Sequence, residues 1–197
     1  MFALIEDAVR AFPETPVTVR QVFPDSFHDE LLAGDLDLVL RRGVDTPPDL
    51  TSAIAAYQPL RLAVNARHPF AGRDCVGVRE LADRPIMVWA PPRQSFYTDF
   101  LVAHCRRSGI EPVLRIDPVQ GTPPSTAVLV DDEACAFVSD PPGPLHDGRV
   151  VVVELDSPLL SPVQALWLGH TVSDFRAAVL AGRDAQAVTP PGDRVSR

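Results

Sequence analysis

The sequence predicts an α/β fold, because the first 40 residues follow the order helix, strand, helix, strand. This order is typical of a parallel sheet covered by helices. A second observation is a long extended stretch over residues 51–64, as expected for a strand that crosses between two sheets. The third is composition. Hydrophobic residues make up 46% of the 197 residues and charged residues 22%, which suits one ordinary domain or two small lobes.

The opening elements are defined by apolar spacing and by prolines. Apolar residues three and four positions apart predict an amphipathic helix with one apolar face, formed by Phe2, Ile5, Val9 and Phe12. Pro13 and Pro16 end this helix. The alternating pattern over residues 17–22 predicts a strand. A short helix then stops at Gly34, and residues 35–40 predict a second strand.

The best-defined helix is predicted over residues 95–108. Ser95 can cap its N-terminus, and Asp99 lies near the positive end of the helix dipole. Arg106 and Arg107 lie in its last turn, and Gly109 follows as the stop. The remaining predicted elements are a helical turn at 78–82, strands at 86–90, 113–116, 134–138, 150–155 and 163–168, and helices at 125–130 and 173–181. Pro-rich loops are expected at 43–50 and 141–144, and a disordered tail at 186–197.

Charge and composition exclude several functions. The chain contains no lysine, so a Schiff-base enzyme, a Walker-type nucleotide site and an ordinary kinase are excluded. The net charge is −8, and the arginines are scattered apart from the doublets Arg41–Arg42 and Arg106–Arg107. We therefore expect no DNA binding by this chain alone. No apolar run is long enough to span a membrane and no signal peptide is evident, so we expect a cytoplasmic protein.

No sequence motif indicates a metal site or a cofactor. The five histidines form no H-E-x-x-H pair, and the three cysteines form no C-x-x-C motif. We expect no metal site, no cofactor and reduced thiols. The chain also has no G-x-G-x-x-G and no G-x-S-x-G elbow. A Ser-His-Asp triad stays open as an alternative, because its members meet in space rather than in sequence.

Three stretches follow predicted strands, where open α/β sheets bind ligands: residues 40–42, 92–95 and 121–126. The helix N-termini there offer free backbone N–H groups. Further hydrogen-bond donors could come from the hydroxyl groups of Ser95, Thr122, Ser125 and Thr126. Arg41 or Arg93 could supply the counter-charge, so the set suits a small carboxylate ligand. The alternative is that both serines are only helix caps and both arginines ordinary surface residues.

Several motifs resemble, in order, the effector-binding domain of LysR-type transcriptional regulators. They are L-L-A-G-D-L-D-L-V-L at 31–40, P-L-R-L-A-V at 59–64 with H-P-F-A-G at 68–72, E-L-A-D-R-P-I at 80–86, and the stretches 105–111 and 150–167. The resemblance covers about residues 1–182. It implies a two-lobed fold like that of type 2 periplasmic binding proteins, with two crossover strands at the hinge. Lobe I would comprise 1–60 plus 163–185 and lobe II 61–162, with the effector in the cleft between them.

The resemblance also implies which residues bind the effector. The family's ligand positions fall on the region after Leu40, which contains Arg41, and on the segment with Thr122, Ser125 and Thr126. They also fall on the turn formed by Arg93, Gln94, Ser95 and Phe96. The sequence departs from the family by starting inside the first helix of the domain, without the winged helix-turn-helix, the linker helix or the first strand of lobe I. The family's glycine-rich turn reads Asp-Asp-Glu-Ala at 131–134.

The resulting expectation is a non-enzymatic domain that senses a small organic-acid effector. A homodimer or higher oligomer is expected to use the first helix, with an exposed Phe2 or Ile5 as its signature. Two alternatives stay open. One is a stand-alone interaction module that forms mixed oligomers with full-length regulators. The other is a hydrolase with a Ser/His site that no sequence motif indicates.

Overall fold

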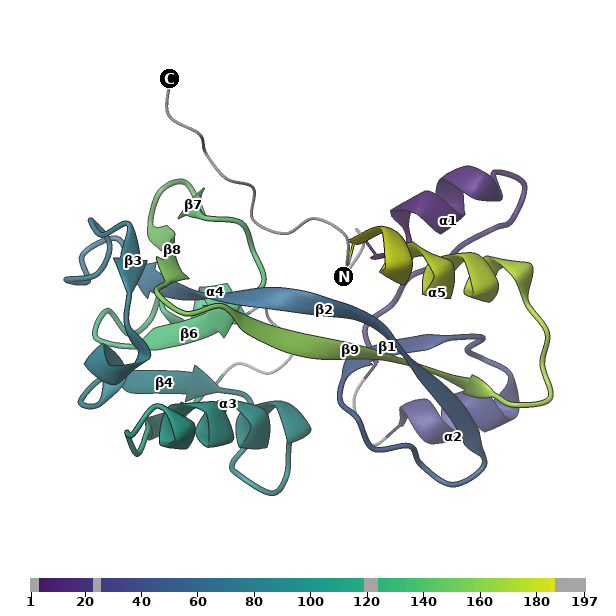
Figure 1. The fold of residues 1–197 in the computed structure, drawn as a ribbon, viewed down its shortest axis with the longest axis horizontal. Coiled ribbons are helices and arrows are strands. Elements are labelled where there is room, and N and C mark those ends of the chain that lie inside the picture. The colour runs from purple at the N-terminus through teal and green to yellow at the C-terminus, as the bar shows by residue number, and fades with distance from the viewer. Residues whose placement is uncertain (1–3, 23–25, 119–123, 187–197) are drawn as a thin grey trace. The chain divides into compact units, whose positions relative to one another are not determined.

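The computed structural model describes residues 4–22, 26–118 and 124–186. The chain divides into two compact units. Unit 1 comprises the residues up to Tyr57 and those from Pro162 onward, and unit 2 comprises Gln58–Ser161. The chain passes between the units within two long strands, β2 (Leu50–Asn65) and β9 (Leu159–Leu168) (Figure 1). The extended stretch predicted at 51–64 is therefore confirmed as a strand.

Unit 1 packs helices on both faces of a small sheet. Strand β1 (Val39–Arg42) pairs antiparallel with β9. Helices α1 (Glu6–Ala11) and α5 (Asp174–Gln186) lie side by side, in a cluster with Leu40 of β1 (Figure 1). Helix α2 (Phe27–Ala33) forms a second cluster with Val39, the preceding residue of β1. Adjacent strand residues thus contact opposite layers, as the alternation of a β-strand requires.

Three predictions for unit 1 are wrong. Residues 17–22 are not a strand, because no neighbouring strand pairs with them among the described residues, and Val19 is 66% exposed. An alternating pattern alone does not hold a strand without a partner. The second strand begins at Val39 rather than Asp35, because the N–H groups of Asp35 and Leu36 donate to the Glu30 carbonyl and close the end of α2. The sheet of this unit is antiparallel at β1, not parallel.

The first helix does not present the exposed Ile5 that was expected of a dimer contact. Ile5 is 7% exposed and packs with Ala8 and Val179 in the cluster between α1 and α5. Its apolar face is therefore used inside unit 1. Phe2, the other expected contact, lies outside the described residues, and so does the predicted tail beyond Gln186, the last residue of α5.

Unit 2 contains a mixed sheet with the order β2-β6-β4-β5. Strand β4 (Pro85–Val88) runs parallel to both β6 (Cys135–Val138) and β5 (Val113–Ile116). The other edge of β2 pairs antiparallel with β8 (Val150–Leu155). Two short strands not predicted from the sequence, β3 (Cys75–Val76) and β7 (Gly143–Leu145), pair with β8, so the expected loop at 141–144 is partly a strand.

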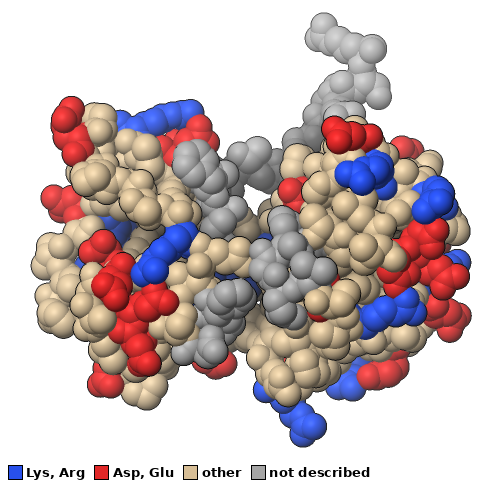
Figure 2. All heavy atoms as spheres, turned by 180° about the vertical axis from the view of Figure 1, so that it is seen from behind, with Lys and Arg blue, Asp and Glu red and all other residues tan. Residues whose placement is uncertain are grey.

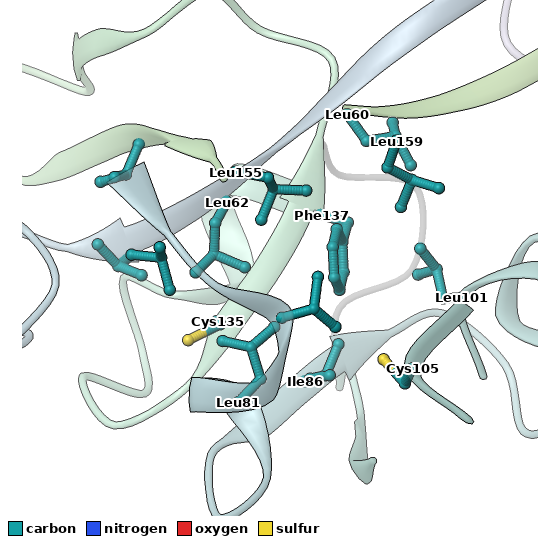
Figure 3. Close-up of a cluster of buried hydrophobic side chains, with 14 of the residues drawn as sticks. Leu60, Leu62, Leu81, Ile86, Leu101, Cys105, Cys135, Phe137, Leu155 and Leu159 are labelled. Carbon is teal, nitrogen blue, oxygen red and sulfur yellow. The ribbon is translucent and has the colours of Figure 1, made fainter. Parts of the chain in front are cut away.

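Helices flank this sheet and close its core. The short helix η2 (Val78–Leu81) and helix α3 (Phe96–Arg107) both contribute buried side chains, among them Leu81 and Leu101. Figure 3 shows these leucines pointing into the same space as Phe137 of β6, which is 1% exposed. The predicted helix at 95–108 is confirmed, whereas the helix predicted at 125–130 forms only as α4 (Pro124–Ala127). None of the helices in the described residues is long and apolar enough to cross a membrane.

Candidate functional site

The parallel strands of unit 2 bring three chain segments to one edge of its sheet. Because β4, β5 and β6 run in the same direction, their carboxyl ends lie at the same edge. The chain leaves β4 towards Ser95, leaves β5 at Asp117 and leaves β6 at Ser139. We refer to this edge as the strand-end site.

Hydrogen bonds from the first turn of α3 fix the segment after β4. The Ser95 hydroxyl accepts the Thr98 N–H at 3.3 Å and so caps the helix, and the Thr98 hydroxyl donates to the Ala90 carbonyl at 2.8 Å. The Asp99 carboxylate accepts the Arg93 N–H at 2.8 Å. Arg93 has a φ of 70°, which a residue with a β-carbon rarely adopts. The N-terminus of α3 is thus held in place by three side chains.

Ser125 lies at the start of α4 and contacts a histidine from another part of unit 2. Its Oγ is 3.3 Å from Nε2 of His146, and Ser125 is 3% exposed. His146 belongs to the turn between β7 and β8, where it and Asp147 both have positive φ, at 50° and 57°. Gly148 follows with a φ of 78°, so three successive residues of the four-residue connection between Leu145 and Val150 are left-handed. The hairpin geometry therefore places the imidazole against the serine.

A small cavity of unit 2 is lined by the residues two positions after each serine, Tyr97 and Ala127, but not by Ser95 or Ser125. It has a volume of about 10 Å³, so it holds one water-sized group. Seven residues of unit 2 line it: Met87, Val88, Trp89, Tyr97, Asp117, Ala127 and Phe137. Asp117 is held against β4 by its backbone N–H, which donates to the Val88 carbonyl at 2.8 Å. Tyr97 donates its hydroxyl to the Phe137 carbonyl at 3.2 Å, which ties the start of α3 to β6.

Arg41 lies in unit 1, where its guanidinium group is engaged by the protein. Its Nε donates to Oε1 of Gln164 at 3.1 Å, and one terminal nitrogen donates to the Asp45 carbonyl. The guanidinium carbon also lies 5.1 Å from the ring centre of Phe27. Burial lowers the pKa of Arg41, and the nearby Asp45 carboxylate opposes this. Since the pKa of an arginine starts so high, the group keeps its charge.

The structure brings only part of the predicted ligand set together. Ser95, Ser125 and their helical neighbours Phe96 and Thr126 lie in unit 2 at the strand-end site, while Thr122 lies outside the described residues. Gln94 is exposed in the turn before α3. The Phe96 ring stacks on that of Phe100, with centroids 6.2 Å apart.

Arg93 faces a different hollow from the cavity. It lines an open depression along α3 together with Pro92, Asp99, Val102, Ala103, Arg106 and Arg107. Other arginines form ion pairs: Arg106 contacts Glu111 at 2.7 Å, and Arg115 contacts Asp131. Figure 2 shows arginine and acidic side chains interspersed over one face of the molecule. The basic residues of this face are therefore mixed with acidic ones.

Sequence reasoning missed four residues that the fold brings to this site. Trp89 and Asp117 each follow a strand directly, so the rule used for the three predicted stretches could have included them. Tyr97 lies in the predicted helix without a polar pattern to single it out. His146 meets Ser125 through the β7–β8 hairpin, and no spacing in the sequence indicates this contact.

A second histidine contact lies in the core of unit 2. Nε2 of His68 is 3.8 Å from Sγ of Cys135, and His68 Nδ1 accepts the Phe70 N–H at 3.1 Å. Burial raises the pKa of the Cys135 thiol to about 12 and lowers the pKa of His68. At neutral pH the thiol and the imidazole are both uncharged, so this pair stabilises the fold rather than forming a nucleophile. Among the described residues, no three His, Cys, Asp or Glu side chains gather as metal ligands.

The same fold occurs in solved LysR-type proteins. The BenM effector binding domain with its effector benzoate has a TM-score of 0.68 at 16% identity, over 100% of this chain and 91% of that one. The effector binding domain of QuiR in complex with shikimate has a TM-score of 0.69 at 16% identity, over 93% and 90%. A putative LysR family regulator from Pseudomonas aeruginosa has a TM-score of 0.69 at 20% identity, over 95% and 67%. The predicted α/β, periplasmic-binding-protein-like fold is confirmed.

Sequence comparison agrees with the structural similarity. A curated relative, the HTH-type transcriptional regulator AlsR of Bacillus subtilis, is 25% identical over 114 residues, which cover 55% of this chain and 36% of AlsR. The chain thus matches about a third of the length of that relative. The family model of the LysR substrate binding domain matches residues 1–182. The resemblance noted in the sequence is therefore confirmed, and the chain belongs to the LysR substrate binding domain family.

Proposed function

We propose that this chain is the effector-sensing domain of a LysR-type transcriptional regulator and that it binds a small organic acid at the strand-end site. The observation that carries the proposal is that Ser95 and Ser125 lie at the starts of helices α3 and α4, each of which follows a strand of the parallel part of the unit 2 sheet. Two proteins with the same fold are described as bound to benzoate and to shikimate. Both of these molecules are small carboxylates.

The proposed chemistry is anion binding without turnover. The N-terminus of the twelve-residue helix α3 carries a partial positive charge and exposes backbone N–H groups. A carboxylate accepts hydrogen bonds from these groups and from the hydroxyls of Ser95 and Ser125. Phe96 and Thr126 flank the two serines, so they are proposed to shape the site. Gln94, Arg93, Arg41 and Thr122 remain predicted contacts.

The Ser125–His146 contact also supports a second candidate, a hydrolase. A serine beside an imidazole is the core of a nucleophilic site, although Ser125 is only 3% exposed. The two candidates differ in one measurement. Hydrolysis of p-nitrophenyl acetate that disappears in Ser125→Ala would establish the enzyme, whereas a rate equal in both proteins supports a binding domain.

The partners follow from the proposed role. We propose that the effector is a small molecule, that the chain associates with a second copy of itself in the cytoplasm, and that DNA is contacted only by a separate winged helix-turn-helix region. Light scattering during gel filtration measures the mass directly. A mass of twice 21.4 kDa supports the dimer, and a monomer at all concentrations contradicts it.

The proposal is tested by titrating the purified chain with benzoate and shikimate and following the melting temperature. Ligand that binds the native state alone stabilises it by about 2.7 kcal/mol at 100 times its Kd. For a chain of this size that raises the melting temperature by roughly 5–10 °C. The rise should be smaller in Ser125→Ala. An equal rise in both proteins contradicts the proposed site.

A further inference from the structure

We propose that the open depression along helix α3 is a second binding site, which takes an elongated dianion, a molecule with an acidic group at each end and an apolar middle. We refer to this depression, which Arg93 lines, as the α3 groove. It lies wholly in unit 2, and neither Ser95 nor Ser125 lines it. The inference therefore does not depend on the effector proposed for the strand-end site.

The α3 groove has the size and the charge of a site for an organic anion. Its volume is about 670 Å³, within the range of about 300–1,000 Å³ that is typical of ligand sites. Its lining carries three arginines against one acidic residue, Asp99. The net charge of the chain is −8, so the groove is locally positive on an acidic protein. An acidic ligand is therefore attracted to this groove although the chain as a whole repels it.

Two of the three guanidinium groups are not used by the fold. Arg106 forms two hydrogen bonds with the Glu111 carboxylate, at 2.7 and 2.8 Å. Within the described part of the chain, the side chains of Arg93 and Arg107 form no ion pair and no hydrogen bond. Burial lowers the pKa of the neighbouring His104, and the charge of Arg107 lowers this pKa further. Two cations of the groove are thus available to a ligand.

The backbone of Arg93 is held in a conformation that its side chain disfavours. Its φ of 70° lies in the left-handed region, which glycine adopts far more readily. The Asp99 carboxylate accepts the Arg93 N–H at 2.8 Å and so fixes this turn against the start of α3. Strained backbone positions of this kind cluster at functional sites. The strain at Arg93 is explained if the arginine itself is needed at the groove.

The two available arginines lie at opposite ends of the groove. Arg93 precedes α3, whereas Arg107 is the last residue of this helix. The lining residues of α3 extend from Asp99 to Arg107, which corresponds to a rise of about 12 Å. Between them, Val102 and Ala103 supply an apolar floor. A ligand that reaches both ends needs two acidic groups joined by an extended apolar chain, and each acidic group can accept two N–H groups from an arginine.

The test compares three probes: decanedioate, with a carboxylate at each end of a long chain, decanoate, with one carboxylate, and butanedioate, whose two carboxylates lie close together. Isothermal titration calorimetry of the full chain at low ionic strength should show decanedioate binding about fivefold more tightly than either of the others, the gain expected from one exposed ion pair.

Two variants remove one end of the groove each. Arg107→Gln should abolish the preference for decanedioate. Arg93→Gly should abolish it too, while its melting temperature stays at or above that of the wild type, because glycine relieves the strain at this φ. Arg149→Gln is the matched control and should keep the preference, since Arg149 is also an exposed arginine of unit 2 but does not line the groove.

The outcomes also separate this inference from the proposed function. The inference is overturned if decanoate binds the wild-type chain as tightly as decanedioate, or if decanedioate does not bind at millimolar concentration. An equal loss of affinity in Arg107→Gln and Arg149→Gln overturns it as well, because only the overall charge then matters. Arg107→Gln should leave the affinity for shikimate unchanged. If the wild-type chain binds decanedioate but not shikimate, only the effector proposal fails.

Discussion

Replacing Ser95 by aspartate separates the two roles assigned to this serine. The Ser95 hydroxyl caps α3 by accepting the Thr98 N–H, and it is also proposed to donate to the effector carboxylate. An aspartate caps a helix as well as a serine does, and its charge suits the positive end of the helix. The same charge repels a carboxylate ligand. Ser95→Asp should therefore preserve the fold and destroy binding.

The magnitudes follow from the cap and from the lost hydrogen bond. Ser95→Ala removes the cap and should cost about 1 kcal/mol of stability, or roughly 2–4 °C of melting temperature. Ser95→Asp should cost none of this. For binding, loss of a hydrogen bond to a charged group costs about 1.5–3 kcal/mol, which is roughly 10- to 150-fold in Kd. Two like charges about 5 Å apart at an effective dielectric constant of about 20 add about 3 kcal/mol of repulsion in the aspartate variant.

The assay combines thermal melts with calorimetric titration of shikimate on four proteins. The aspartate variant should be at least as stable as the wild type, and the alanine variant less stable than both. Affinity for shikimate should be highest in the wild type, lower in the alanine variant and lowest in the aspartate variant. Ser95→Thr is the matched control, because it keeps both the hydroxyl and the cap. If the aspartate variant binds shikimate as tightly as the wild type, Ser95 does not contact the carboxylate, and the reasoning is refuted.

Three further predictions concern unit 2. Burial lowers the pKa of His68, so the unfolded chain binds a proton more readily than the folded one, and stability is lost as pH falls below about 6.5. The melting temperature should therefore be lower at pH 5.5 than at pH 7.5, and this drop should be smaller in His68→Asn. An equal drop in both proteins would exclude His68 as its source. Cys75 is exposed, whereas Cys105 and Cys135 are buried, with thiol pKa values raised to about 11 and about 12. Ellman's reagent at pH 8 should therefore label one thiol quickly and the other two only after unfolding. Fast labelling of all three thiols contradicts the packing. Phe137→Ala should lower the free energy of unfolding by about 3–5 kcal/mol in urea melts, because the ring is 1% exposed, and a loss below 1 kcal/mol would be inconsistent with its place in the core.

The elements of unit 2 could be predicted from the sequence because local signals coincide there. The helix at 95–108 has a capping serine, an apolar face and a glycine stop, and each agrees with the others. The prediction of a strand at 17–22 is wrong, because strand pairing depends on a neighbour that local alternation does not report. The same limit applies to β3 and β7, which exist only through their pairing with β8.

The candidate site was predictable only in part, for a similar reason. Ser95 and Ser125 could be found because they start helices after strands. Asp117 follows a strand too, but the aromatic residues that line the cavity with it come from three other places, the residue after β4, strand β6 and helix α3. His146 reaches Ser125 across the turn of a hairpin that the sequence did not indicate. Arg93 was placed in the correct turn, whereas the direction of its side chain along α3 depends on tertiary packing.

The most direct test of the central claim is a melting-temperature screen of small organic acids against the wild-type chain and Ser95→Asp in parallel. An effector-sensing domain predicts that at least one acid raises the melting temperature of the wild type in a concentration-dependent way and leaves the variant unchanged. If every acid leaves both proteins unchanged, or shifts both equally, then this chain does not sense an organic acid at the N-terminus of α3.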